Sequence, residues 1–341
     1  MTGFYSPVKR RMPPGHAGCF TRNRFIAMNG LMSLFQSDFA LRAAPPRAAH
    51  LMRLATYASV SVAATLIAVK IGALYATGAA VMLATLVDSI LDGAASLLNL
   101  VAVRHSLQPA DEEHRFGHGK AEALAGLGQA AFIGGSAVFL GFESVQRILD
   151  PQPVTQSNIG IAVTLFALVL TIALVAFQRY VSRASGSVAV SADALHYASD
   201  VALNIGVIAG LLLAGRFGLI FADSLIALVI AGWIGYSAVQ IFRSSYNQIM
   251  DRELPDEDRQ KVHAIALAHQ EVIAIHDVRS RLAGTTPFIQ LHLEMQPDMT
   301  LHAAHLIADE VEAKVKAAFP GAEVIIHQDP AGFEKHPAFH D

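Results

Sequence analysis

The segment that decides the fold is AVMLATLVDSILDGAASLLNLVAVR, residues 80–104, an apolar run interrupted by Asp88 and Asp92. A second apolar run contains the stretch HYASD, which begins with His196 and ends with Asp200. Each run is long enough to cross the roughly 30 Å hydrocarbon core of a bilayer as a helix. Within each pair the two polar residues are four positions apart, so both side chains lie on one helix face. Ionisable groups are therefore expected inside a membrane, where they are costly and mark a functional site.

The composition as a whole is that of a membrane protein. Of the 341 residues 53% are hydrophobic and only 16% are charged, with a mean hydropathy of +0.42, whereas soluble domains carry about 25% charged residues. The formal net charge of -3 offers no basic surface, so no nucleic-acid partner is expected. Because Cys19 is the only cysteine, any metal must be held by histidines and carboxylates.

The hydropathy pattern predicts a membrane all-α domain, a six-helix transmembrane bundle. The six spans are expected at about 52–76, 80–104, 122–148, 158–180, 187–213 and 220–246. Residues 1–47 contain several basic side chains, prolines and glycines without a sustained apolar run, which predicts a basic, disordered N-terminal extension. The transmembrane domain is therefore expected at residues 48–250.

Arginine and lysine are unevenly divided between the two ends of the spans. They gather in the N-terminal extension, the 105–121 loop, the 179–186 turn and the segment after the sixth span, whereas the opposite loops contain only Arg147 and Arg216. Basic residues remain preferentially on the cytoplasmic side of a membrane. Both termini are therefore predicted to be cytoplasmic.

Residues 251–330 lack the long apolar runs of the spans, and their pattern predicts a cytoplasmic α+β domain followed by a tail at 331–341. Pro255 and the acids after it begin a predicted helix that runs to about Ala268. Two strands, a second helix and a third strand are expected at about 275–282, 288–295, 301–318 and 322–328. The order αββαβ indicates a small sheet backed by helices. Because its core is small, dimer contacts or bound metal are expected to stabilise it.

The four ionisable groups of the two opening runs are expected to form one metal site if the spans pack together: Asp88, Asp92, His196 and Asp200. Three carboxylates and one imidazole suit tetrahedral Zn²⁺, and Fe²⁺, Co²⁺, Mn²⁺ or Cd²⁺ can also be accommodated. Polar side chains can instead join helices by hydrogen bonds, but two matched ionisable pairs favour a metal. Protons compete for the same lone pairs, and His196 is the predicted proton carrier because its ordinary pKa is near 6.5.

The loop between the second and third spans contains a second candidate metal site. Asp111, His114 and His118 lie close in sequence beside glycines and could wrap a cation; a hydrated polar loop explains the same residues, and the spacing leaves both readings open. Lys120 and Asp251 stand at the membrane faces of the third span and of the segment after the sixth. A salt bridge between them could tie the two domains together, although a solvated lysine is an equally good explanation.

Most of the fifteen histidines follow position 260, which indicates a third metal site in the C-terminal domain. The predicted ligands are His276, His292, His305, His327 and Asp329. His292 and His327 are expected to face away from the aliphatic side of the sheet, and the helix with His305 is expected to cover that side. Single surface histidines are ordinary, but this group together favours a metal cluster. His302 is left undecided, and His105 has no partner pattern.

These motifs resemble those of the cation diffusion facilitator family, in particular its bacterial ferrous-iron and zinc efflux pumps. The matching stretches run from about residue 50 to 330 and include LVDSILD at 86–92, PAD at 109–111, FGHGK at 116–120, ADALHY at 192–197, DR at 251–252, HD at 276–277, FIQLHLEM at 288–295 and IIHQD at 325–329. These motifs are specific to the family, and the resemblance covers most of the chain.

The resemblance implies a homodimeric antiporter of the cell inner membrane that exports Zn²⁺ from the cytoplasm in exchange for protons, with Fe²⁺ or Cd²⁺ as further substrates. It implies that the four intramembrane ligands are the transport site and that Asp111, His114 and His118 form a loop site. It also implies that the histidines and Asp329 of the C-terminal domain form a regulatory binuclear site, with Zn²⁺ as the ligand, in a metallochaperone-like fold. The N-terminal extension departs from the family pattern.

Two other classes of function compete with a transporter. A membrane-anchored metal sensor would use the C-terminal cluster, but it would not need four ligands within the spans. An intramembrane metalloenzyme would need a general base beside its metal, as in H-E-x-x-H, and this motif does not occur.

Overall fold

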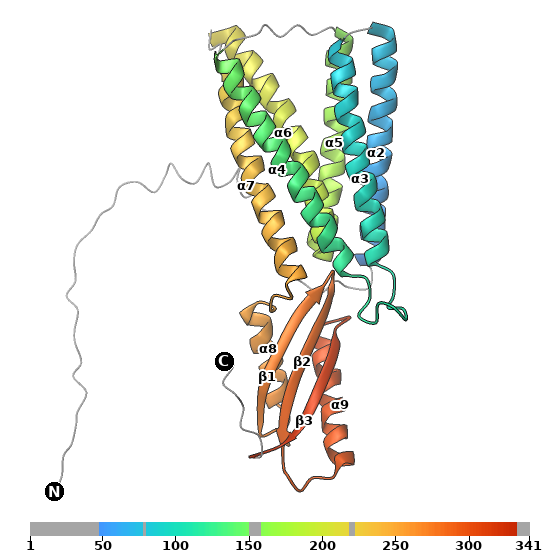
Figure 1. The fold of residues 1–341 in the computed structure, drawn as a ribbon, viewed down its shortest axis with the longest axis vertical. Helices are drawn as coiled ribbons and strands as arrows, with labels where there is room; N and C mark the ends of the chain where they lie inside the picture. The colour runs from blue at the N-terminus through green and yellow to red at the C-terminus, as the bar shows by residue number, and fades with distance from the viewer. Residues whose placement is uncertain (1–47, 78–79, 150–157, 218–221, 333–341) are drawn as a thin grey trace, which may run out of the picture. The chain divides into compact units, whose positions relative to one another are not determined.

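The computed structural model describes residues 48–77, 80–149, 158–217 and 222–332 (Figure 1). The predicted N-terminal extension, 1–47, lies outside the described residues, as does most of the predicted tail, 331–341. The domain boundaries proposed from the sequence stay predictions.

The described part of the chain contains six long helices where six spans are predicted. They are α2 (Ala48–Thr77), α3 (Ala80–Ser106), α4 (Lys120–Leu149), α5 (Asn158–Ser185), α6 (Val188–Phe217) and α7 (Ala222–Ile249). Five of them, all except α6, are apolar and long enough to cross a membrane. Helix α6 carries Asp193, His196 and Asp200, and residues 188–199 are all buried, so Asp193 and His196 are surrounded by neighbouring helices.

The six helices pack as two groups, and α6 contacts helices of both groups. Helices α4, α6 and α7 contact one another, α2 contacts α3 and α5, and α5 also packs on α6 (Figure 1). The interface of the first group is built from small side chains such as Ala137, Ala192 and Ala238, all buried. Small residues let helix backbones approach closely, which is how helices associate when no water is present to drive them together.

The start of α6 is fixed by a carboxylate from α4. Glu122, only 1% exposed, accepts a hydrogen bond of 3.3 Å from the backbone N–H of Ala189. The hydroxyl of Ser187 accepts a second one, of 3.1 Å, from Val190. These contacts satisfy amide groups that have no partner within the helix, and a negative charge is favourable at a helix N-terminus. The position of His196, two turns further along, therefore depends on α4.

The C-terminal domain has the predicted order of elements. Its elements are α8 (Asp256–Leu267), β1 (Ala274–Ala283), β2 (Thr286–Met295), α9 (Leu301–Ala318) and β3 (Glu323–Pro330). The sheet order is β1-β2-β3, with β1 and β2 antiparallel and β2 and β3 parallel. The tight turn between β1 and β2 uses Gly284 at a positive φ of 62°, a conformation that glycine adopts without strain.

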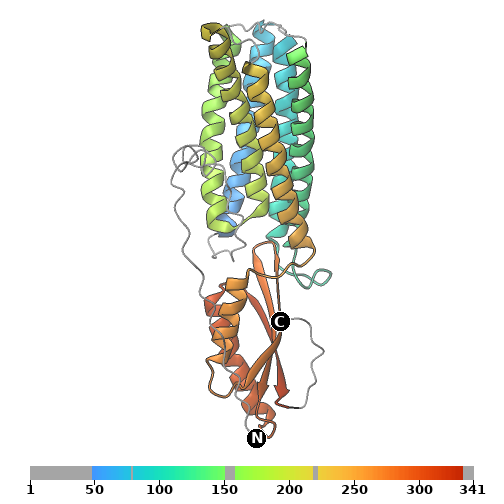
Figure 2. The same ribbon diagram turned by 90° about the vertical axis from the view of Figure 1, so that its left-hand side faces the viewer.

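The two faces of this sheet differ in chemistry. Leu291 and Leu293 on β2 are buried in one core with Val311 and Val315 on α9, and both helices lie on this side of the sheet (Figure 2). His292 faces the other way, as its alternating position predicts. The helix that carries His305 covers the aliphatic face, because the apolar stripe of α9 packs there against Leu291 and Leu293.

A β-bulge in β1 could not be read from simple alternation. Ile275 and Val278 both pack against the core although they are three positions apart. The pairing register with β2 shifts between His276 and Arg279, and Asp277 adopts a positive φ of 46°. The extra residue lets both apolar side chains reach the core. It leaves His276 paired with His292 on the opposite face.

Candidate metal-binding sites

The first candidate site lies between α3 and α6. Asp92 on α3 and His196 and Asp200 on α6 each offer one ligand atom, and these atoms all lie within 4.8 Å of one another. The side chains of His196 and Asp92 are only 7% and 16% exposed. Two carboxylates and an imidazole at this spacing can coordinate a divalent transition metal.

The closest contact in this site has a consequence for proton binding. His196 Nε2 lies 3.1 Å from Asp92 Oδ1. Two lone pairs would repel each other at this distance, so a hydrogen bond between the two atoms requires a proton on one of them. A metal ion that used both atoms as ligands would have to displace that proton.

Asp88, the fourth predicted ligand of this site, is not among the three convergent groups. It lies one turn from Asp92 on α3, at an exposed position, where it interacts electrostatically with Asp92. The Lys70 ammonium on α2 donates a 2.6 Å hydrogen bond to Ser89 Oγ and therefore lies beside the same turn. A role for Asp88 as a ligand requires its side chain to move toward the other three and stays a prediction.

A buried polar network, which the sequence analysis did not identify, supports α6 beneath this site. The Asp193 carboxylate, 1% exposed, lies one turn before His196. It accepts hydrogen bonds from the hydroxyl of Ser59 on α2 and from the amides of Gln178 on α5, 2.7 Å, and Gln129 on α4, 3.3 Å. The sequence signal that could have identified this network is the presence of Gln129 and Gln178 inside apolar spans, since buried polar groups require partners.

The three residues of the second candidate site converge in the 107–119 loop, and their role as a metal site stays a prediction. One ligand atom each from Asp111, His114 and His118 lies within 4.8 Å of the others. Asp111 Oδ1 accepts a 2.6 Å hydrogen bond from the backbone N–H of His114, which holds the pKa of Asp111 below its usual range. Gly117, at a φ of 74°, donates from its N–H to the His114 carbonyl and turns the chain so that His118 returns to Asp111.

The third candidate site is centred on Asp329 of β3, whose side chain is 3% exposed. Its Oδ2 lies 2.8 Å from His292 Nδ1 and 3.3 Å from His276 Nε2. Its Oδ1 lies 3.1 Å from His327 Nε2. Strand register explains the convergence, since His276 pairs with His292 and His292 pairs with His327 across the sheet.

Two residues change the predicted composition of this cluster. His305 lies on α9, 62% exposed, with its Nε2 3.6 Å from Asp309, and it does not join the convergent atoms of the described residues. Glu294 does approach the cluster, with Oε1 3.7 Å from His276 Nε2. Its position two residues after His292 on one strand face was the signal that could have identified it. A ligand role for His305 stays a prediction.

Lys120 and Asp251 form the ion pair considered from the sequence. Lys120 Nζ lies 2.9 Å from Asp251 Oδ1, and Arg281 approaches the same oxygen to 3.2 Å. Partial burial opposes ionisation of Asp251, but the hydrogen bonds from Lys120 and Arg281 outweigh it and leave its pKa below the ordinary value. A role of this pair in tying the two domains together stays a prediction.

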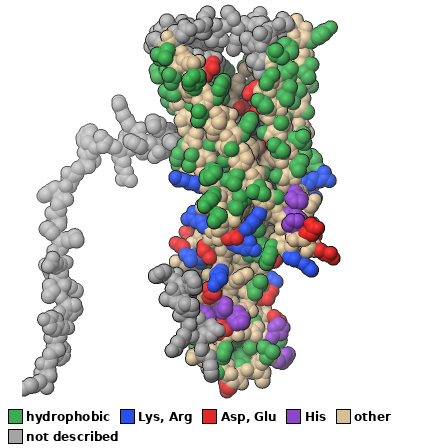
Figure 3. Space-filling view, viewed as in Figure 1, with side chains coloured by type: hydrophobic (Ala, Val, Ile, Leu, Met, Phe, Trp, Pro, Cys, Tyr) green, Lys and Arg blue, Asp and Glu red, His purple; other side chains and the backbone are tan. Residues whose placement is uncertain are grey.

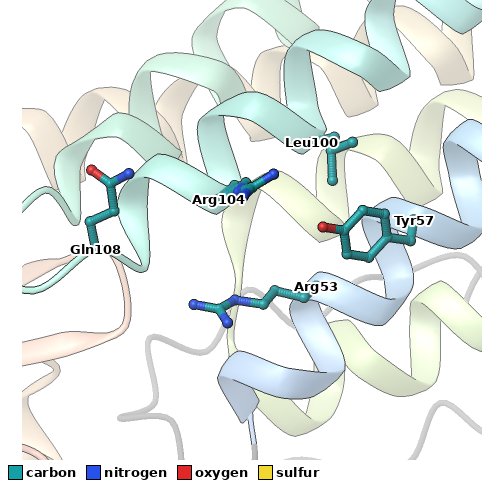
Figure 4. Close-up of a pocket in the computed structure, with 5 residues that line it drawn as sticks. All are labelled: Arg53, Tyr57, Leu100, Arg104 and Gln108. Carbon is teal, nitrogen blue, oxygen red and sulfur yellow. The ribbon is translucent and has the colours of Figure 1, made fainter.

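The surface divides by chemistry in a way that fits a membrane protein. Large apolar side chains such as Leu98, Val138 and Val229 are more than 70% exposed along the helices, where green predominates in Figure 3. Near the ends of α2 and α3, Arg53 and Arg104 line a pocket of about 200 Å³ with Tyr57, Leu100 and Gln108 (Figure 4). Two guanidinium groups repel cations, so this pocket is unsuited to a metal ion.

A bundle of apolar helices that encloses carboxylates and an imidazole has the architecture of a membrane transport protein for cations. Residues 56–250 match the cation efflux transmembrane domain, and residues 254–331 match the cytoplasmic domain of cation efflux proteins. The chain therefore belongs to the cation efflux family, the cation diffusion facilitators.

Close relatives carry the same description. The cation-efflux pump FieF of Cronobacter sakazakii is 50% identical over 281 residues, which cover 82% of this chain and 93% of that protein. The FieF pump of Yersinia enterocolitica is 47% identical over 285 residues, covering 84% and 95%. The protein is thus a membrane transporter for the efflux of divalent metal cations and not an enzyme, as predicted, and the metalloenzyme alternative is excluded.

Proposed function

We propose that the protein is a proton-coupled antiporter that exports Zn²⁺ from the cytoplasm by alternating access, with Fe²⁺ and Cd²⁺ as further substrates. The observation that carries this proposal is the convergence of Asp92, His196 and Asp200 inside the helical bundle. Nitrogen and carboxylate ligands suit Zn²⁺, and the same set accepts other divalent transition metals. Asp88 completes the four-ligand site when the metal is bound.

Proton coupling follows from the contact between His196 and Asp92. The proton exchanged in this proposal is the one that joins His196 Nε2 and Asp92 Oδ1, 3.1 Å apart, in a hydrogen bond. A metal ion that enters from the cytoplasm coordinates both atoms and displaces that proton. After the bundle changes from an inward-open to an outward-open conformation, a proton from outside competes with the metal for His196 and displaces it. Each half of the cycle therefore exchanges one ion for the other at the same atoms.

The remaining predicted sites have supporting roles in this proposal. The loop site binds Zn²⁺ at Asp111, His114 and His118. The cytoplasmic site, centred on Asp329, binds Zn²⁺ as a regulatory ligand and stabilises a homodimer through the C-terminal domain. The protein resides in the inner membrane with both termini in the cytoplasm.

Metal and proton fluxes in sealed vesicles test the central proposal. Purified protein is reconstituted with a zinc-sensitive dye and a pH-sensitive dye, and both signals are recorded after Zn²⁺ is added. We expect coupled zinc and proton movement that is lost in Asp200→Ala and His196→Ala and retained in the control His302→Ala. Zinc flux that keeps its full pH dependence in His196→Ala would contradict the assigned proton carrier. Folded protein without any flux would favour a membrane-anchored sensor.

Two further measurements test substrate and orientation. Competition among Zn²⁺, Fe²⁺, Cd²⁺ and Mn²⁺ in the same vesicles ranks the substrates. Cys19, the only cysteine, lies in the N-terminal extension. A thiol reagent that cannot cross membranes should label Cys19 in inside-out vesicles and not in intact cells; the opposite result would place the N-terminus outside.

A further inference from the structure

We propose that His105 is a fourth ligand of the loop site, so that the last turn of α3 helps to hold a divalent cation. The inference deepens the proposed function, because it rests on metal binding by Asp111, His114 and His118. It adds to that set a histidine that has no sequence pattern of its own.

The position of His105 beside His118 carries the inference. The ring centroids of His105 and His118 lie 4.5 Å apart, and those of His114 and His118 lie 4.6 Å apart. His105 is thus as close to the central imidazole as one of the convergent ligands is. His118 is 8% exposed, with Nε2 3.3 Å from Asp111 and with Nδ1 buried and without a hydrogen-bond partner in the described part of the chain.

Coordination chemistry gives the second reason. Asp111, His114 and His118 supply three ligands, whereas zinc sites that do not carry out catalysis are almost always closed by four protein ligands in a tetrahedron. His105 is exposed, so its imidazole can rotate toward the other three. Its backbone is fixed, because the His105 carbonyl accepts a 3.0 Å hydrogen bond from the N–H of Gln108. The resulting set of three nitrogens and one oxygen favours Zn²⁺ or Co²⁺.

The location of His105 gives this ligand a mechanical consequence. It lies thirteen residues after Asp92 on the same helix, about 20 Å along the helix axis. The His118 carbonyl accepts a 2.9 Å hydrogen bond from Ala121 in the first turn of α4. A cation held by His105 and His118 together would therefore connect the end of α3 to the start of α4, and metal in the loop would restrain a helix that carries the transport site.

Cobalt and zinc binding to the full-length protein in detergent test the inference. The background variant carries Asp200→Ala and His292→Ala, so that the loop site dominates binding. With Co²⁺ as the probe, we expect the intense visible absorption of a tetrahedral complex, which should weaken markedly in His105→Ala. The Zn²⁺ affinity, measured against a competing chelator, should fall by about ten-fold or more, or about 1.4 kcal/mol. The control His50→Ala, at an exposed position on α2, should change neither signal.

The outcomes separate this inference from the proposals on which it rests. Asp111→Ala should abolish loop binding. If Asp111→Ala weakens Zn²⁺ binding and His105→Ala does not, the fourth ligand is wrong and the loop site stands. If neither has an effect, both are wrong, whereas zinc flux through vesicles tests the transport site independently. The melting temperature of each variant, followed through Trp233, the only tryptophan, confirms that the bundle is folded.

Discussion

Replacing Glu122 with alanine tests whether a carboxylate from α4 fixes the start of α6. The side chain is 1% exposed and accepts the 3.3 Å hydrogen bond from the Ala189 N–H. Leaving that amide unpaired in a buried position costs about 1–3 kcal/mol. Loss of the carboxylate from the helix N-terminus adds about 1 kcal/mol. We therefore expect Glu122→Ala to lower the free energy of unfolding by about 2–4 kcal/mol.

Thermal melting in detergent measures this effect through a single reporter. Trp233 on α7 is the only tryptophan and packs against two of the buried clusters of the bundle. At about 2–4 °C per kcal/mol for a domain of this size, Glu122→Ala should melt roughly 5–15 °C lower. Glu122→Gln keeps an acceptor and should lose less, and Glu112→Ala, in the exposed loop, should change little. A Glu122→Ala protein that melts within 2 °C of the unmodified protein would refute the reasoning, because such a shift corresponds to a loss of at most about 1 kcal/mol.

Three further predictions concern the C-terminal half of the chain. Because the pKa of Asp251 is below its ordinary value, its stabilising effect should be present above about pH 4 and disappear as pH falls through the lowered pKa; acid titration of melting temperature should show this loss, and Asp251→Asn should lack it. Thr300 accepts a hydrogen bond from the Ala303 N–H at the start of α9, so Thr300→Ala should cost about 1 kcal/mol, measured by denaturant unfolding against Thr286→Ala. Leu291→Ala, at a 1% exposed core position, should cost about 2–5 kcal/mol, and a loss below 1 kcal/mol in the same assay would contradict its place in the core.

The sequence predicted the elements of this protein well because their signals are local. Spans follow from runs of apolar residues, and the αββαβ order of the C-terminal domain follows from periodicity and turn residues. The spacing of Asp88 and Asp92, and of His196 and Asp200, also fixes which side chains share a helix face. Alternation on β2 likewise placed His292 opposite the aliphatic core.

Contacts between elements were harder to foresee. Nothing in the local pattern of β1 reveals the bulge at Asp277, because it arises from the need of Ile275 and Val278 to reach one core. The position of α9 shows the same point: its own apolar stripe places His305 away from the histidine cluster. The pairing of Asp193 with amides on two other helices depends on how the bundle closes.

What the sequence by itself determined is the set of ionisable groups, their spacing and the membrane setting that makes them costly. Only the tertiary structure decided which of them meet: Asp92 with His196 and Asp200, Asp329 with three imidazoles, and His105 beside His118. The physical reason is the difference in sequence separation over which the two kinds of interaction act. Helix and strand periodicity acts over a few residues, whereas a metal site requires atoms from distant segments to lie within a few ångströms, and packing alone sets that distance.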